Sequence, residues 1–375
     1  MTLMLILLGL HAYIGWRLMP ALAAVAPVLP WLLAGVLLAS WLLMPVPLLA
    51  RRIRRQPLSD RLATAGLLLM GLFSSLFVLT LLRDLLGGVA WIASFWQPLP
   101  AWAAPASALT VPLGAVLLSS WGYVNARRTA RVVRVDVPIA GLPPALHGFS
   151  IAQISDVHVG PTIKRGYLEA IVARVNTLDA DLVAVTGDLV DGSVQHLAVH
   201  VAPLAALRSR HGTFFVTGNH EYYCGAQAWI DELRRLGVRV LLNEHVLLKR
   251  GDATLALAGV ADYGAHNFEA THRSDPQAAI AGVPDEARVR VLLAHQPRSA
   301  PAAAAAGFHL QLSGHTHGGQ FLPWKWFVRL QQPFTAGLHR WQDLWVYVSR
   351  GTGYWGPPKR LGAPSEITHL RLVAG

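Results

Sequence analysis

The chain is poor in cysteine and in acidic side chains, and both shortages narrow what it can be. Cys224 is the single cysteine among 375 residues, which excludes an intrachain disulfide and a zinc site built on cysteine ligands. Lysine and arginine number 32 against 21 acidic residues, for a formal net charge of +11. A basic surplus of this size suggests a nucleic-acid or membrane partner, and the positions of the charges distinguish the two.

The basic surplus lies near the start of the chain. Up to Asp136 the sequence holds eleven arginines, no lysine and three aspartates, so this part carries +8 of the total of +11. The remainder carries only +3. Because the arginines flank apolar stretches, they fit membrane topology better than a surface that follows nucleic-acid phosphates, and no nucleic-acid partner is expected.

Four stretches of mostly apolar residues lie at about 1–19, 31–50, 62–82 and 104–124. Each has the roughly 20 residues that a helix needs to cross a bilayer. A cleaved signal peptide is disfavoured for the first stretch, because no basic segment precedes it. The tryptophans and prolines of 85–102 suit an interfacial loop better than a fifth span. The sequence therefore predicts a transmembrane anchor over 1–126, with a packed soluble helical domain as the alternative.

Arginine clusters give this anchor an orientation. One cluster lies between the second and third spans and another follows the fourth: Arg51, Arg52, Arg54, Arg55 and Arg61, then Arg127, Arg128, Arg131 and Arg134. Positively charged loops favour the cytoplasmic side. With four spans, both clusters and the rest of the chain face the cytoplasm. We expect a multi-pass integral membrane protein, in the cytoplasmic membrane if the source is bacterial.

Residues 132–375 have the pattern of one α/β domain. Short apolar runs at Ile151–Ser155, Leu182–Thr186 and Phe214–Thr217 alternate with helical patterns near 166–177, 197–207 and 227–236. Later segments, such as Val289–Leu293, favour strands. This order predicts two sheets packed face to face with helices outside them.

Metal-binding side chains follow the first three of these strands. Asp156 and His158 lie on one side of an extended chain because side chains alternate, and they offer one metal an oxygen and a nitrogen. Gly187 lets the chain turn sharply, so that the carboxylate of Asp188 points outward and can bridge two cations about 3.5–4 Å apart. The third strand delivers Asn219, whose amide oxygen is a neutral ligand.

Further candidates complete a two-metal hydrolytic site. His220 directly follows Asn219 and could act on the substrate. His295 follows the run Val291–Ala294, and His315 and His317 follow the run that ends at Leu312. Oxygen and nitrogen donors at several strand ends are the arrangement that such a site requires.

These ordered motifs resemble those of the calcineurin-like metallophosphoesterase superfamily, and in particular its membrane-anchored branch. The motifs are Asp156-Val157-His158, Gly187-Asp188, Gly218-Asn219-His220-Glu221, His295 and Gly314-His315-Thr316-His317, and the resemblance covers roughly Phe149 to Leu372 without a departure at a ligand position. It implies a four-layer αββα sandwich behind an all-α transmembrane domain of about four helices. It also implies two metal sites, one formed by Asp156, His158, Asp188 and His317 and the other by Asp188, Asn219, His295 and His315.

The resemblance implies a metal-dependent phosphoester hydrolase. His220 would be the acid, or a contact to the phosphate, and we expect Glu221 to orient His220 or a metal ligand. Mixed nitrogen and oxygen donors suit manganese, iron or zinc alike, so the two ions are not identified.

One segment bears on the substrate. Residues 321–330 combine Trp324 and Trp326 with Lys325 and Arg329, a make-up that suits the headgroup region of a bilayer. A hydrophobic flap on the sheet edge is an equally good reading. Tyr354 to Arg360 has a similar composition and resembles a stretch of membrane-linked relatives. We favour a lipid-linked phosphoester or pyrophosphate substrate; the alternatives are a soluble nucleotide or other small phosphoester, a phosphoprotein, and a non-catalytic membrane scaffold.

Overall fold

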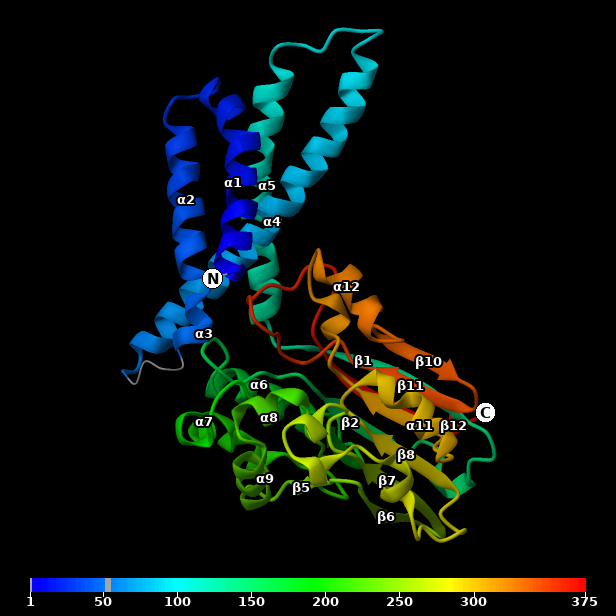
Figure 1. Ribbon diagram of the computed structural model, residues 1–375. Helices are drawn as coiled ribbons and strands as arrows, with labels where there is room; N and C mark the ends of the chain where they lie inside the picture. The colour runs from blue at the N-terminus through cyan, green and yellow to red at the C-terminus, as the bar shows by residue number, and fades with distance from the viewer. Residues whose placement is uncertain (1, 51–54) are drawn as a thin grey trace. The chain divides into compact units, whose positions relative to one another are not determined.

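The computed structural model describes residues 2–50 and 55–375 and divides into two compact units, shown in Figure 1. The helical unit comprises Met1–Arg127 together with Gly356–Leu361, and the sheet unit comprises Arg128–Trp355 and Gly362–Gly375. A short segment from near the end of the chain therefore belongs to the helices formed by its beginning. Arg51, Arg52 and Arg54 of the first arginine cluster lie outside the described residues.

Apolar helices form the first part of the helical unit. They are α1 (Thr2–Ala23), α2 (Leu29–Leu43), α3 (Val46–Ala50), α4 (Leu58–Ala93) and α5 (Ala103–Arg127). Four segments of the described chain, Met4–Ala23, Leu29–Leu49, Leu58–Ala93 and Ala103–Arg127, are long and apolar enough to cross a membrane. The predicted number of apolar spans is thus confirmed, although α4 runs well beyond the predicted 62–82.

The prediction of a loop over 85–102 is wrong for its first half. Residues 85–93 continue α4, and only 94–102 are non-helical. Gly87 and Gly88 weaken the helix without breaking it, because the first proline after them is Pro98. Of the tryptophans and prolines that suggested an interfacial loop, only Trp91 lies on this long helix, and the others follow its end.

The segment Gly356–Leu361 packs between α4 and α5. Lys359 Nζ donates hydrogen bonds to Gly71 O (2.7 Å), Ser75 Oγ (2.5 Å) and Ser119 Oγ (3.4 Å). The Arg360 backbone N–H donates to Gly122 O at 2.9 Å. A side chain at Gly122 would place a Cβ 2.7 Å from Lys359 Cγ, so the glycine makes room for this lysine.

The sheet unit contains two six-stranded sheets. The first has the order β1-β12-β2-β3-β4-β5 and the second the order β10-β11-β9-β8-β7-β6. The strands are β1 (Arg131–Ile139), β2 (Ser150–Ile154), β3 (Leu182–Val185), β4 (Thr213–Phe215), β5 (Arg239–Val240), β6 (Glu244–Arg250), β7 (Ala253–Gly259), β8 (Val289–Leu293), β9 (Leu310–Ser313), β10 (Gly337–Trp341), β11 (Leu344–Val348) and β12 (Glu366–Ala374). Strands β2, β3 and β4 run parallel, as do β7, β8 and β9, so their carboxyl ends meet at one edge of each sheet.

One hydrophobic core joins the inner faces of the two sheets. Ile151, Leu182 and Leu370 from the first sheet lie in one buried cluster with Leu255 and Val291 from the second. Helices cover the outer faces: α6 (Arg165–Asn176), α7 (Val194–Val201) and α9 (Ala226–Arg235) on the first sheet, and α10 (Pro276–Ile280) and α11 (Ala300–Ala305) on the second (Figure 1). This layering confirms the predicted sandwich.

Candidate metal centre

The carboxyl ends of five strands bring the predicted donors together. Asp156 and His158 follow β2, Asp188 follows β3, Asn219 begins the short helix α8 (Asn219–Cys224) after β4, His295 follows β8, and His315 and His317 follow β9. Asp156, His158, Asp188, His315 and His317 all have positive φ, between 49° and 69°. Such backbone is costly for residues with a Cβ and persists where the surrounding structure enforces it, as at binding sites.

Asp156, His158 and His317 form a first group of donors. Their potential ligand atoms lie within 4.8 Å of one another. His158 Nε2 is 3.0 Å from His317 Nε2, and His317 Nε2 is 3.5 Å from Asp156 Oδ1. All three side chains are buried. Two imidazole nitrogens and a carboxylate that converge in this way fit a divalent cation.

Asp188, His295 and His315 form a second group, with their ligand atoms again within 4.8 Å. His295 Nε2 is 3.1 Å from Asp188 Oδ2 and 3.2 Å from His315 Nδ1. Asn219 joins this group through its Oδ1, which is 3.1 Å from His315 Nδ1. This set is the one that the family resemblance assigns to the second metal.

Asp188 lies between the two groups. Its Oδ2 is 3.1 Å from His295 Nε2 in the second group and 3.9 Å from His158 Nε2 in the first. Gly187, with φ of 86°, permits the turn that carries this carboxylate, because a Cβ there would lie 2.6 Å from the backbone nitrogen of Gly218. The position suits a carboxylate shared by two cations.

Hydrogen bonds to the surrounding backbone fix several donors in their orientations. The backbone N–H of His315 donates to both carboxylate oxygens of Asp156, at 2.9 and 3.1 Å. His295 Nδ1 is 2.8 Å from Thr186 O, so this nitrogen donates and leaves Nε2 as the one available to a metal. Burial, followed by the charge of His295, lowers the pKa of His315 to about 3, which keeps its imidazole in the neutral form that binds metals.

His220 faces an aspartate that the sequence analysis did not identify. His220 Nδ1 is 2.5 Å from Asp191 Oδ1, and the same oxygen is 3.1 Å from His158 Nδ1. Burial alone would lower the pKa of His220, but Asp188 and Asp191 outweigh it and raise the pKa to about 9. The imidazole is therefore held as a proton donor beside the first group. The only signal for Asp191 was its position three residues after Asp188.

Glu221 supports the turns of the site instead of contacting His220. Its carboxylate accepts hydrogen bonds from three backbone N–H groups, those of Gly218 (2.7 Å), Asp188 (3.0 Å) and Leu189 (2.8 Å). It thereby joins the turn after β3 to the start of α8. Burial raises its pKa to about 7.

Aromatic rings flank His220. The ring of Tyr223 lies 5.2 Å and that of Trp355 5.9 Å from the imidazole, and both residues are about half exposed. Trp355 is held by Gln320, which accepts from its backbone N–H at 3.0 Å and donates to its carbonyl at 2.9 Å. These rings form a partly open wall beside the candidate acid.

The segment with Trp324, Lys325, Trp326 and Arg329 forms the helix α12 (Trp324–Gln331), in which no residue is buried. Trp324 is 50%, Trp326 63% and Phe327 51% exposed. The helix begins seven residues after His317. Its Lys325 backbone packs directly against Gly319, where a Cβ would lie 2.4 Å from Lys325 Cα. The structure thus places this segment on the surface and not inside a packed sheet edge.

Comparisons with known proteins agree with this geometry. A profile of the calcineurin-like phosphoesterase family matches residues 149–319. The chain is 43% identical over 270 residues to a transmembrane protein with metallophosphoesterase domain from Bos taurus and 39% identical over 264 residues to its counterpart from Danio rerio. These matches cover 69% and 68% of this chain, and it spans 60% of the length of each of these relatives.

Two further similarities complete the comparison. An uncharacterized metallophosphoesterase of Aquifex aeolicus is 32% identical over 260 residues, which cover 69% of this chain and 97% of that protein. Among solved structures, the 5'-nucleotidase precursor of Thermus thermophilus has a TM-score of 0.40 and 15% identity over 60% of this chain and 54% of that one.

Proposed function

We propose that this chain, which belongs to the calcineurin-like phosphoesterase family, is a membrane-anchored phosphoester hydrolase that uses two divalent metal ions. The observation that carries the proposal is the position of Asp188. Its carboxylate lies between a group formed with His295 and His315 and a group formed by Asp156, His158 and His317.

The donor atoms fit such ions by their chemistry and arrangement. His158 Nε2 and His317 Nε2 face each other at 3.0 Å, as do His295 Nε2 and His315 Nδ1 at 3.2 Å. A divalent cation held by these residues would satisfy the facing nitrogens and would compensate the charges of the buried aspartates. Manganese, iron and zinc all accept this mixture of nitrogen and oxygen donors.

The chain's own residues then have distinct tasks. When bound, the two ions would activate a water molecule and hold the oxygens of the scissile phosphate. His220 donates a proton to the departing oxygen, and Asp191 keeps its imidazole oriented and protonated. Glu221 holds the turn that carries Asp188. The buried strand ends exclude bulk water from one side of the reacting phosphate.

The four apolar helices support a membrane anchor for this hydrolase. Arg55 precedes α4, and Arg61 lies in its first turn. Arg127 ends α5, and Arg128 follows it. Such arginine clusters favour the cytoplasmic face of a membrane. An even number of spans puts the amino terminus and the sheet unit on that same face. We therefore propose a multi-pass protein with a cytoplasmic catalytic unit.

A lipid-linked phosphoester or pyrophosphate is the substrate we favour. The exposed Trp324, Trp326 and Phe327 of α12 follow the candidate donor His317 within ten residues. Aromatic residues beside Lys325 and Arg329 suit the interface of a bilayer, where they would bring a phosphate close to the donors. A soluble nucleotide or other small phosphoester is the alternative, and the partly open wall of Tyr223 and Trp355 beside His220 would suit its planar ring.

Asp188→Ala tests the shared carboxylate. The full chain, purified in detergent with manganese, is assayed for bound metal by elemental analysis and for hydrolysis of a panel of lipid and soluble phosphoesters. We expect the variant to lose hydrolysis and metal from both groups, whereas Asp285→Ala, an exposed aspartate elsewhere, should change neither. A variant that keeps two equivalents of metal and normal turnover would remove the bridging role. If the wild-type protein binds no metal, the proposed hydrolase function is refuted and the protein is better explained as a non-catalytic membrane scaffold.

A further inference from the structure

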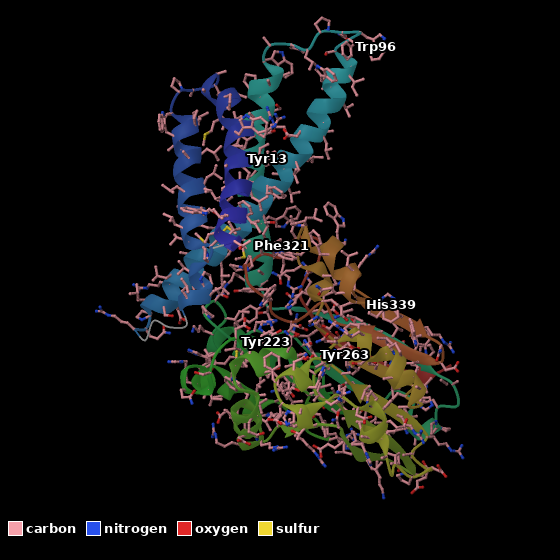
Figure 2. The ribbon with its side chains drawn as sticks, viewed as in Figure 1. Tyr13, Trp96, Tyr223, Tyr263, Phe321 and His339 are labelled. Carbon is pink, nitrogen blue, oxygen red and sulfur yellow. The ribbon has the colours of Figure 1, made fainter. Side chains whose placement is uncertain are left out.

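Arg298 has an unusual environment beside the second donor group. It lies in the short turn Pro297–Ser299, three residues after His295. Its guanidinium stacks on the ring of Tyr263 at 4.9 Å, and Tyr263 is 44% exposed (labelled in Figure 2). Among residues 2–50 and 55–375, Arg298 makes no ion pair, and its Nε is buried without a hydrogen-bond partner.

The backbone around Arg298 is fixed, although its charge is not neutralised. The Arg298 N–H donates to Gln332 Oε1 at 3.2 Å, and Gln332 in turn donates to Gln296 at 3.3 Å. Asp262, the carboxylate nearest to Tyr263 along the chain, accepts from Gln296 Nε2 at 2.8 Å and from the Gly264 N–H at 2.8 Å. The carboxylate of Asp262 therefore accepts hydrogen bonds from amide groups and forms no ion pair with the Arg298 guanidinium.

Charge balance suggests what would occupy this position. Two divalent ions bring four positive charges, and Asp156 and Asp188 offset two of them. The other two match the charge of one phosphomonoester, so the donors need no arginine to bind a single phosphate. Arg298 adds a positive charge on the side of His315, whereas His220 and Asp191 adjoin His158 of the first group. A buried guanidinium nitrogen without a partner is costly, and an anion accepting from it removes that cost.

We propose that Arg298, supported by the ring of Tyr263, binds a second phosphate of the substrate, in addition to the phosphate held at the metal donors. This inference rests on the proposed phosphoesterase function and narrows its substrate class to molecules with two neighbouring phosphates, such as pyrophosphate-linked compounds. Arginine suits the role because its planar fork binds phosphate oxygens in pairs while its face stacks on an aromatic ring.

The test compares two inhibitors that differ by one anionic group. Methylphosphonate and methylenediphosphonate compete with an aryl phosphoester on the metal-loaded full chain, and bound metal is measured after each titration to detect chelation. We expect Arg298→Gln to weaken the diphosphonate about tenfold to hundredfold, the usual range for a charged hydrogen bond, while methylphosphonate changes less than threefold. Arg290→Gln removes a half-buried arginine of β8 that has no carboxylate partner in the described chain, and it should change neither inhibitor.

Each other result overturns the inference. Equal weakening of both inhibitors would place Arg298 at the phosphate on the metals, and no weakening would show that no anion binds there. If Arg298→Gln loses its metals, the same ratio is measured on Arg298→Lys, which keeps the charge but not the planar fork, and on Tyr263→Leu, which removes only the supporting ring. A weaker diphosphonate in both variants, with methylphosphonate unchanged, supports the inference, and an unchanged ratio in both overturns it. Wild-type protein inhibited equally by the two compounds sinks this inference alone. Wild-type protein that neither binds metal nor is inhibited by methylphosphonate refutes the proposed function itself.

Discussion

Replacing Trp324, Trp326 and Phe327 together with serine separates the two readings of α12. None of the three side chains is buried, and each exposes half of its surface or more. The fold therefore loses little when they are removed, and the melting temperature in detergent should stay close to that of the wild type. A packed flap would have buried these rings, and its loss would cost several kcal/mol of stability.

The effect on a substrate in the bilayer follows from the exposed area. Full burial of a large apolar side chain is worth about 1.5–3 kcal/mol. Because roughly half of each ring is available to lipid, the three together contribute about 3 kcal/mol. That free energy corresponds to about a hundredfold rise in the apparent KM for a lipid-embedded phosphoester. A small soluble aryl phosphoester should be hydrolysed at a nearly unchanged rate, because the proposed metal-binding residues of the protein follow strand ends and do not lie on α12.

The assay measures both substrates on the same preparation in phospholipid vesicles. Leu247→Ser on β6 is the matched control, because Leu247 is 43% exposed on the edge strand of the second sheet, far from the donors along the chain. The reasoning fails if the triple variant loses activity on both substrates in parallel and also melts earlier. That result would make α12 a packing element and would leave the lipid-linked substrate without its main support.

Three further predictions concern the acid, the topology and the helical unit. His220→Ala should keep its metals and lose about 10² to 10⁴ in rate, with a smaller loss for good leaving groups, and an equal loss on all leaving groups would indicate phosphate binding instead. A reporter fused after Gly375 that works only in the cytoplasm should be active, whereas signal from an externally active reporter would require an odd number of spans. Gly122→Ala should lower the free energy of unfolding by about 1–3 kcal/mol, because the added Cβ overlaps Lys359 Cγ. Gly35→Ala is the control, since its added Cβ meets nothing within 4 Å and should cost no stability. Equal melting temperatures for the two variants would contradict the packing of Lys359.

The structure brings the candidate donors close together, and the sequence signal for this convergence is local. Each donor directly follows a short buried strand, and parallel strands bring their carboxyl ends to one edge, so position along the chain translates into position in space. The roles of these donors as ligands remain proposals. The layers of the sandwich followed in the same way from apolar runs that alternate with helical patterns.

What escaped prediction depends on contacts between distant parts of the chain. Asp191 gains its role from His158 and His220, which are 33 and 29 residues away, while its own surroundings read as an ordinary turn after a strand. The helical start of 85–102 was masked by tryptophans and prolines that lie mostly beyond Leu85–Ala93. Helix α12 could be recognised as a segment rich in aromatic and basic residues, but only its exposure distinguishes a surface helix from a packed flap.

The position of Lys359 has a consequence for the order in which this protein assembles. Ser119 and Lys359 are 240 residues apart, and Ser75 and Lys359 are 284 apart, so α4 and α5 emerge from the ribosome long before the lysine they enclose. Before the lysine is made, the two serines can form a hydrogen bond with each other, in which Ser119 Oγ donates to Ser75 Oγ at 3.4 Å. Closing so long a loop is slow, since contacts distant in sequence form late. The helical unit can therefore be completed only after residues 128–355 of the sheet unit have been synthesised, so its final packing depends on a segment made after most of the other unit.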